Sequence, residues 1–179
     1  MTTIDGGESH HTRGPVARFL AADHARLDAL LQRAVAQPRT IDRAAYAEFR
    51  AGLLKHIGME EKILLPGAQR ARGGAPLPAA AKLRLDHGAL AALLVPSPTP
   101  AIIDAIRTIL TAHNAVEEDA GGVYEACEQL LGAEAEALLA SLRAAPAVPV
   151  NQHVDSPLVR NATRRAVARA GFDPDAMQL

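Results

Sequence analysis

Apolar residues recur every three to four positions over most of the chain, which is the spacing of a helix with one buried face. No convincing stretch alternates apolar and polar residues as a strand would. The stretches with helical spacing cover residues 15–37, 40–66, 78–95 and 100–142. We therefore predict an all-α protein whose four helices, joined by short connections, form an up-down-up-down four-helix bundle.

Capping and helix-breaking residues mark the ends of these helices. Thr40 is the predicted N-cap of the second helix, and Pro66 is expected to break or bend it. Residues 71–78 (ARGGAPLP) form a predicted loop. Gly121 and Gly122 are expected to kink or interrupt the fourth helix.

Two segments lie outside the bundle, which we assign to residues 15–146. Residues 1–14 lack apolar periodicity and are predicted to be a flexible arm. Residues 147–179 are predicted to hold an extended linker and a short basic helix over 157–170. Its basic residues are Arg160, Arg164, Arg165 and Arg169. They could meet an anionic partner, but we favour a helix that docks on the bundle or pairs two protomers, with its arginines in water.

Composition limits the partners and the compartment. Hydrophobic residues make up 49% of the 179 positions and aromatic residues only 3%, which favours close packing of Ala, Leu, Ile and Val on helices. The net charge of −1 gives no reason to expect nucleic acid or an anionic membrane as a partner. The chain has a single cysteine, Cys127, and neither a signal-peptide pattern nor a membrane-length apolar run. A cytoplasmic protein is therefore expected.

Two short motifs each occur twice, in alternating order. DHARL at 23–27 and DHGAL at 86–90 share D-H-x-x-L, while HIGMEE at 56–61 and HNAVEE at 113–118 share H-x-x-x-E-E. Each histidine of the first motif lies in the middle of an apolar stripe. In the second motif the histidine and the first glutamate are four residues apart and share one helix face. The second glutamates, Glu61 and Glu118, are turned about 100° away and are expected either to support the ligands or to face solvent.

If the four apolar stripes meet, four imidazoles and two carboxylates converge in the core. Such groups are costly to bury unpaired, whereas metal ions bind deprotonated nitrogen and oxygen donors. We predict two metal ions, each held by two histidines and bridged by the two glutamates. The predicted ligands are His24, His56, Glu60, His87, His113 and Glu117. A lone buried histidine is more often structural, but the same placement of all four histidines favours metal binding.

The donor set favours iron, with manganese or zinc as alternatives. Both tyrosines, Tyr46 and Tyr124, fall on metal-bearing stripes. The helical rise puts their backbones about 10–15 Å along the axis from the nearest ligands. Core packing or a hydrogen bond close to the metals is therefore favoured over direct ligation. Cys127 is interpreted as a buried thiol, and the histidines of the flexible-looking segments (His10, His11 and His153) are not expected to bind metal.

These motifs resemble the hemerythrin-like superfamily, and specifically the bacterial HHE cation-binding domains, over residues 14–146. The resemblance implies a hemerythrin-like bundle with a non-haem di-iron centre, oxo- or hydroxo-bridged, that reacts with O₂, hydrogen peroxide or nitric oxide. Carried over by motif, its ligands would be the six residues already predicted. The chain departs from the oxygen-carrying members in two places. Leu83 stands where they have a fifth histidine, and Glu117 follows His113 by four residues where they have an aspartate five residues on.

Both departures weaken the case for a reversible O₂ carrier and favour catalase-like or peroxidase-like turnover of peroxide. One alternative is a module that binds or senses O₂ or NO without turnover, with the basic C-terminal helix passing the state to a partner. Another is donation of iron to damaged iron centres. Family members that act in such repair carry an additional cysteine-containing domain, which this sequence does not show.

Overall fold

The computed structural model describes residues 13–179, so the arm predicted over 1–14 lies almost wholly outside the described residues. The described part is helical and contains no strand, which confirms the all-α prediction. Its elements are α1 (Pro15–Ala34), α2 (Arg43–Met59), the π-helical turn η1 (Glu60–Leu64), α3 (Leu65–Ala71), α4 (Ala80–Leu93), α5 (Pro100–Glu118), α6 (Val123–Leu131), the 3₁₀ turn η2 (Gly132–Glu134), α7 (Ala135–Arg143) and α8 (Pro157–Arg169).

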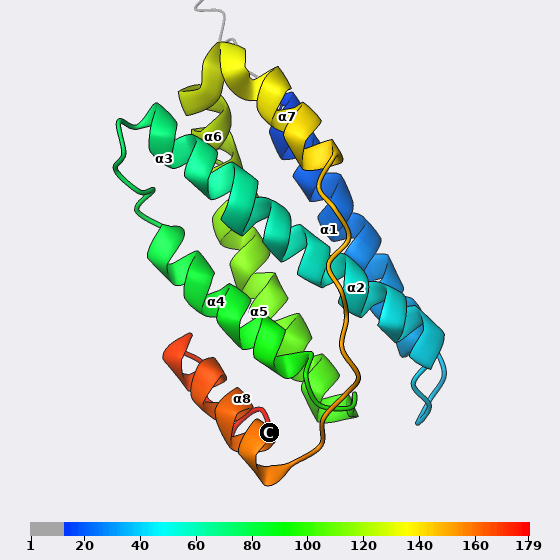
Figure 1. The fold of residues 1–179 in the computed structure, drawn as a ribbon. Helices are drawn as coiled ribbons and strands as arrows, with labels where there is room; N and C mark the ends of the chain where they lie inside the picture. The colour runs from blue at the N-terminus through cyan, green and yellow to red at the C-terminus, as the bar shows by residue number, and fades with distance from the viewer. Residues whose placement is uncertain (1–12) are drawn as a thin grey trace, which may run out of the picture.

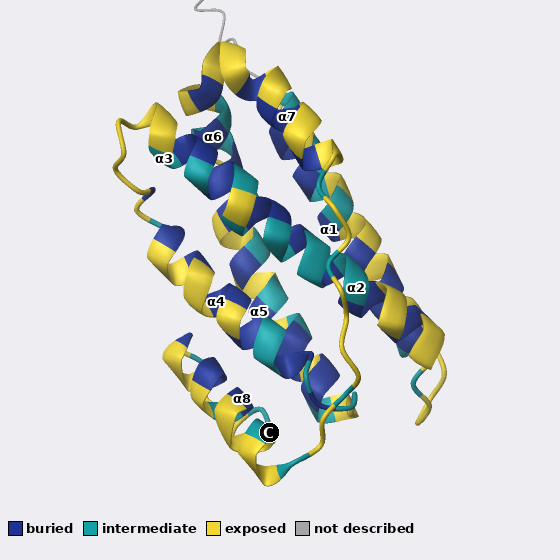
Figure 2. Ribbon diagram, viewed as in Figure 1, coloured by how far each residue is buried: buried dark blue, intermediate teal, exposed yellow. Residues whose placement is uncertain are grey.

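The long helices lie side by side, with α2, η1 and α3 forming one continuous rod (Figure 1). Their buried faces point inward (Figure 2). The core has two apolar clusters. One includes Leu27, Phe49 and Ile106, and the other includes Leu20 and Leu64. Along α1, α4 and α5 the predicted ligands fall between these two clusters, and on the rod His56 and Glu60 flank Met59 at the edge of the second cluster.

Asp42, not Thr40, caps the second helix. Its carboxylate accepts hydrogen bonds from the backbone N–H groups of Ala44 and Ala45 at 2.9 and 3.0 Å. An aspartate at this position adds a negative charge at the positive end of the helix dipole, an advantage that a threonine lacks. The predicted N-cap is therefore wrong by two residues, because Thr40 lies in the connection before the cap.

Pro66 does not end the second helix, which continues to Ala71. The π-helical turn directly before it explains why. Proline lacks an N–H, and its ring collides with the carbonyl four residues earlier in a regular α-helix. In the wider turn the N–H of Leu65 instead donates to the carbonyl of Glu60, five residues back. The proline is thus accommodated without ending the rod.

The fourth predicted helix is interrupted at Gly121 and Gly122, as expected, so that α5 ends at Glu118 and α6 begins at Val123. Gly121 has a φ of 76°, and a Cβ at Gly122 would lie only 2.7 Å from the carbonyl oxygens of Glu117 and Asp119. A second turn, η2, was not predicted. Gly132 there has a φ of 49°, and α7 leaves this turn to pack against α1.

Residues 144–156 run as an extended segment along α2, and α8 then packs against α4 (Figure 1). The guanidinium of Arg50, which is buried, donates to the carbonyls of Leu94 and Asn151 at 2.8 and 2.6 Å. The hydroxyl of Thr163 on α8 donates to the carbonyl of Ala92 on α4 at 3.1 Å. None of the helices within 13–179 has the length and apolar character to cross a membrane.

Candidate metal centre

The six predicted ligands come together in the middle layer of the core. All are at most 6% exposed. Nitrogen and oxygen atoms of Glu60, His87, His113 and Glu117 form one group in which every pair lies within 4.8 Å. His24, His56 and Glu60 form a second such group. Glu60 belongs to both groups, so its carboxylate lies between two sets of donors that could each hold a metal ion.

The Nε2 atoms of the four histidines all face the two central carboxylates. One oxygen of Glu60, Oε2, lies 3.1 Å from His87 Nε2, and the other, Oε1, lies 3.3 Å from His56 Nε2. Glu117 Oε2 lies 3.3 Å from His113 Nε2 and 3.5 Å from His24 Nε2. The Nε2 atoms of His87 and His113 are only 3.2 Å apart. Nitrogen and oxygen lone pairs are thus directed at one small volume.

The opposite ring nitrogen, Nδ1, faces an outer carboxylate in every case. The four pairs are His24–Glu118 at 2.6 Å, His87–Glu61 at 2.7 Å, His56–Asp23 at 2.9 Å and His113–Asp86 at 3.5 Å. A carboxylate at Nδ1 holds the proton there and leaves Nε2 free to bind a metal. The second glutamate of each H-x-x-x-E-E motif therefore supports the histidine of the D-H motif. The aspartate of each D-H motif supports the H-x-x-x-E-E histidine in return.

Asp23 and Asp86 belong to the D-H-x-x-L motifs but are not among the residues predicted to form the site. The signal was available, because both precede a core histidine directly and both recur with the repeat. The spacing within the motif does not show which histidine each aspartate contacts. Each aspartate is turned about 100° from its own histidine and contacts a histidine of the neighbouring helix, which depends on how the helices pack.

Each outer carboxylate is in turn paired with a cation. Arg26 Nε donates to Asp23 at 2.8 Å, Arg13 Nη1 to Glu118 at 3.0 Å and Arg84 Nε to Glu61 at 3.2 Å, and Lys82 Nζ donates to Asp86. The cations are about half exposed, at 47–51% of their side-chain surface. Four chains of imidazole, carboxylate and cation therefore connect the buried layer with the surface.

Tyr124 brings its hydroxyl into the buried layer. The hydroxyl donates to Glu60 Oε1 at 2.5 Å and lies 3.1 Å from Glu117 Oε2. It is also 3.2 Å from His24 Nε2 and 3.4 Å from His56 Nε2. The separation expected from the helical rise does not apply, because the chain turns at Gly121–Gly122 and α6 carries Tyr124 back toward the ligands.

Burial and neighbouring charges shift the pKa values of the glutamate, histidine and tyrosine side chains in this layer. Burial, followed by the charge of Glu60, raises the pKa of Glu117 to about 7. Burial alone would lower the pKa of His56, but Glu60 and Asp23 raise it to about 10. Burial and the two glutamates raise the pKa of Tyr124 well above its usual value. The two central carboxylates thus repel each other, and Glu60 favours positive charge on the imidazole of His56.

Several polar atoms in the layer have no hydrogen-bond partner although they are buried. One is Glu117 Oε1. The others are Glu60 Oε2 and His113 Nδ1, whose neighbours, His87 Nε2 at 3.1 Å and Asp86 at 3.5 Å, are not aligned for a hydrogen bond. Buried carboxylate oxygens without donors are costly, and a metal ion would satisfy them. Two carboxylates and four imidazoles, each with a supported Nδ1, fit iron, manganese or zinc by donor type.

The other residues considered from the sequence lie elsewhere. Tyr46 packs against the rings of Phe49 and His153, with centroids 6.0 and 6.2 Å away, in the opposite apolar cluster from Tyr124. Cys127 is buried, and its pKa is raised to about 12 by burial and the nearby glutamates. Leu83 is buried in the apolar cluster beside the ligands. His10 and His11 lie outside the described residues.

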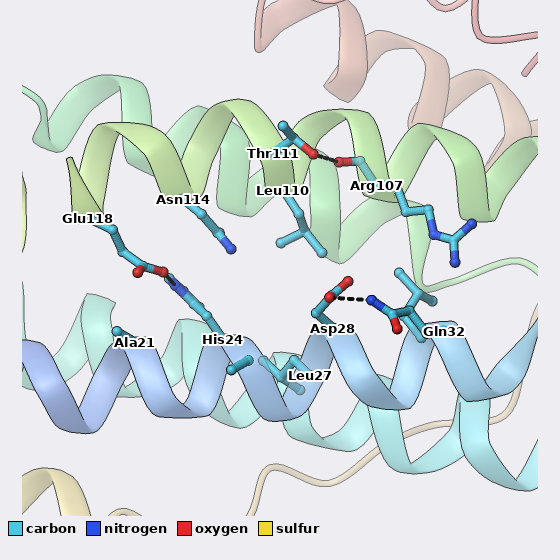
Figure 3. A pocket seen from close by; sticks show the side chains of 12 residues that line it. Ala21, His24, Leu27, Asp28, Gln32, Arg107, Leu110, Thr111, Asn114 and Glu118 are labelled. Carbon is cyan, nitrogen blue, oxygen red and sulfur yellow. Dashed lines mark hydrogen bonds and ion pairs between the residues drawn. The ribbon is translucent and has the colours of Figure 1, made fainter.

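A groove of about 530 Å³ between α1 and α5 reaches the edge of the site (Figure 3). The His24–Glu118 pair lies at one end, and Arg107 and Gln32 lie toward the other. The side chain of Asn114 points from α5 toward α1 across this groove. The groove therefore brings solvent to the outer side of one candidate ligand.

Comparison with models of known families, with curated proteins and with solved structures finds no match to this chain.

Proposed function

We propose that this chain is a hemerythrin-like four-helix bundle that holds two iron ions and turns over hydrogen peroxide, in a catalase-like or peroxidase-like reaction. The ligands would be His24, His56, Glu60, His87, His113 and Glu117. The observation that carries the proposal is the two-sided environment of the histidines. Every Nε2 faces the central carboxylates and every Nδ1 faces an outer carboxylate.

A purely structural role explains this arrangement poorly. A buried ion-pair network is stabilising only when its members satisfy one another, and here two glutamate oxygens are left without donors. Two imidazole Nε2 atoms also face each other at 3.2 Å. Both features favour cations between the donors. Bound iron would supply the electron transfer that peroxide turnover requires.

The residues around the ligands would control protons and water. Tyr124 holds a proton on its hydroxyl and donates it as a hydrogen bond to Glu60. Its raised pKa keeps the phenol protonated in the metal-free protein. Leu83 excludes a polar donor where oxygen carriers of the resembled family have a histidine. The ligand shell is then one strong donor short, which favours turnover over storage.

The alternative is a module that takes up O₂ or NO without turnover. The docking of α8 on α4 is the observation in its favour, because a helix attached to the bundle could report a change at the centre. The two functions differ in what happens after the ligand arrives.

Metal analysis combined with optical spectra before and after peroxide tests both. Two irons per chain with rapid O₂ release, or with peroxide consumed at the expense of a reductant, are expected. Glu60→Gln removes the shared carboxylate, and Glu48→Gln on the exposed face of α2 is its control. A stable adduct without turnover would favour the binding module. Zinc, or no metal after reconstitution with iron, would refute the di-iron proposal.

A further inference from the structure

The C-terminal tail, residues 144–179, reaches the candidate metal centre through one of the four carboxylate–cation chains. Lys82 on α4 pairs with Asp86, and its Nζ also lies over the ring of Phe172, 5.2 Å from the ring centroid. Asp86 faces Nδ1 of His113. The contacts thus run from the tail, through an ammonium and a carboxylate, to a candidate ligand.

Phe172 is held in this place by the way α8 ends. Gly171 adopts a φ of 90°, and the N–H of Phe172 donates to the carbonyl of Val167 at 3.2 Å. This turn directs the chain back from the end of the helix, as glycine commonly does. Val167 is fully buried in the same apolar cluster as residues of α4. The position of the Phe172 ring therefore depends on α8 being docked.

The tail is anchored at further points. The carboxylate of Asp155 accepts hydrogen bonds from the backbone N–H and the hydroxyl of Ser97, at 2.8 and 2.7 Å. The N–H of Val154 donates to the carbonyl of Val95 at 3.1 Å. These contacts add to those of Arg50 and Thr163 and fix the tail along its length.

Of the four imidazole–carboxylate pairs, the pair next to the tail differs from the others in burial and in distance. The side chain of Asp86 is 1% exposed, whereas the other three outer carboxylates are 16–25% exposed. Its distance to the histidine, 3.5 Å, is the longest of the four. Lys82 pairs with one oxygen of Asp86 and His113 Nδ1 faces the other, so the orientation of this carboxylate depends on Lys82.

We propose that the tail is a positioning element of the candidate metal centre, in which Phe172 holds Lys82 against Asp86 and Asp86 faces Nδ1 of His113. Lys82 and Phe172 are then positioning residues for a ligand that neither of them touches. Because coupling between two sites is reciprocal, metal binding at His113 must also tighten the docking of the tail. The statements about metal binding rest on the proposed function, whereas the contacts from Phe172 to His113 do not.

Histidine ring ¹⁵N shifts of the full-length, metal-free protein test the positioning directly. Phe172→Leu keeps the apolar bulk but removes the aromatic face, and Lys82→Met removes the charge. Both are expected to shift the His113 ring nitrogens and to leave those of His87 in place. Arg84→Met, on the same helix but paired with Glu61, should do the reverse. Lys82→Arg should restore the His113 signal.

Metal binding gives the second readout. The metal dissociation constant should rise about two- to fivefold in Phe172→Leu and about 10–100-fold in Lys82→Met. Iron should slow proteolysis of the tail in the wild type and not in Lys82→Met. Unchanged His113 shifts in both variants would overturn the proposal. If the wild type binds no metal, the proposed function fails while the ¹⁵N comparison still decides the positioning role.

Discussion

The two halves of the candidate centre start from the same motifs and end differently. In the first half, Glu60 and Glu61 lie in the π-helical turn that joins α2 to α3. In the second half, α5 ends directly after Glu117 and Glu118, and the chain turns at two glycines. Only the second half therefore sends a side chain back to the ligands. Equal motifs did not lead to equal backbones.

The residue seven positions after each ligand glutamate shows the consequence. After Glu117 it is Tyr124, whose hydroxyl lies among the donors. After Glu60 it is Gly67, where a Cβ would overlap the side chain of Leu138. In the first half the glycine thus leaves room for α7 to pack closely. In the second half the tyrosine brings a hydroxyl group to the donors.

The largest effect is expected from the shared carboxylate. Glu60 belongs to both donor groups, whereas Glu117 belongs to one. Glu60→Ala should abolish binding of both metals, and Glu117→Ala should weaken binding mainly on the His87–His113 side. Metal stoichiometry after reconstitution measures the difference. Equal loss in both variants would contradict the asymmetry between the two carboxylates.

The pH dependence should also be large. His56 and His113 have pKa values of about 10 and about 9, raised by acidic neighbours against the effect of burial. Because both lie above the unfolded value of about 6.5, their contribution to stability is complete below that pH and is lost as the pH rises through 9 to 10. The contribution of Glu117, with a pKa raised to about 7, is lost earlier in the same direction.

The metal-free protein should therefore lose stability between pH 6.5 and 10, while its metal affinity should rise, because metals require the deprotonated donors. His24 opposes the stability trend only below its ordinary pKa, since burial and His56 lower its pKa. Denaturant unfolding at several pH values, with and without iron, measures both slopes. Parallel slopes with and without metal would argue against these histidines as ligands.

The sequence supported the helical class and the convergence of six donors because both follow from position along an apolar stripe. His24 and His87 interrupt leucine stripes, and such stripes must face a core. The pairing of Asp23 with His56 did not follow, because it joins two helices and depends on their packing. The place of Tyr124 depends on one turn, and a helical wheel drawn through Gly121–Gly122 puts it too far away.

Gly122→Ala should break the turn that makes the second half different. The added Cβ would lie 2.7–2.9 Å from three carbonyl oxygens, which cannot yield without moving the end of α5. Overpacking of this kind costs about 1–3 kcal/mol. Thermal unfolding measures the cost, and Gly88→Ala, where no atom lies within 4 Å of the new Cβ, is the matched control. Equal stability of both variants would show that the turn tolerates rearrangement.

Tyr124→Phe should remove the hydroxyl group and keep the aromatic ring. The ring still fills the apolar cluster, but Glu60 Oε1 loses its donor at 2.5 Å. A buried acceptor left unsatisfied costs about 1–3 kcal/mol, so the metal-free protein should be destabilised while binding of two metals persists. Chemical denaturation before and after metal loading checks this. Tyr46→Phe, which removes a hydroxyl that has no partner, should cost less.

The smallest effect is expected at Pro66 in the first half. Alanine there restores an N–H and removes the ring that a regular helix would not accept, so the π-helical turn could revert. Reversion would rotate α3 relative to α2 and pull Leu64 and Leu65 from the apolar cluster, where both are at most 3% exposed. That packing favours keeping the turn, and we expect Pro66→Ala to change the free energy of unfolding by less than about 1 kcal/mol.

Metal stoichiometry should stay unchanged, because Glu60 stands at the start of the turn and would keep its orientation. A lost metal in this variant would show instead that the proline itself sets the wide turn and places the shared carboxylate.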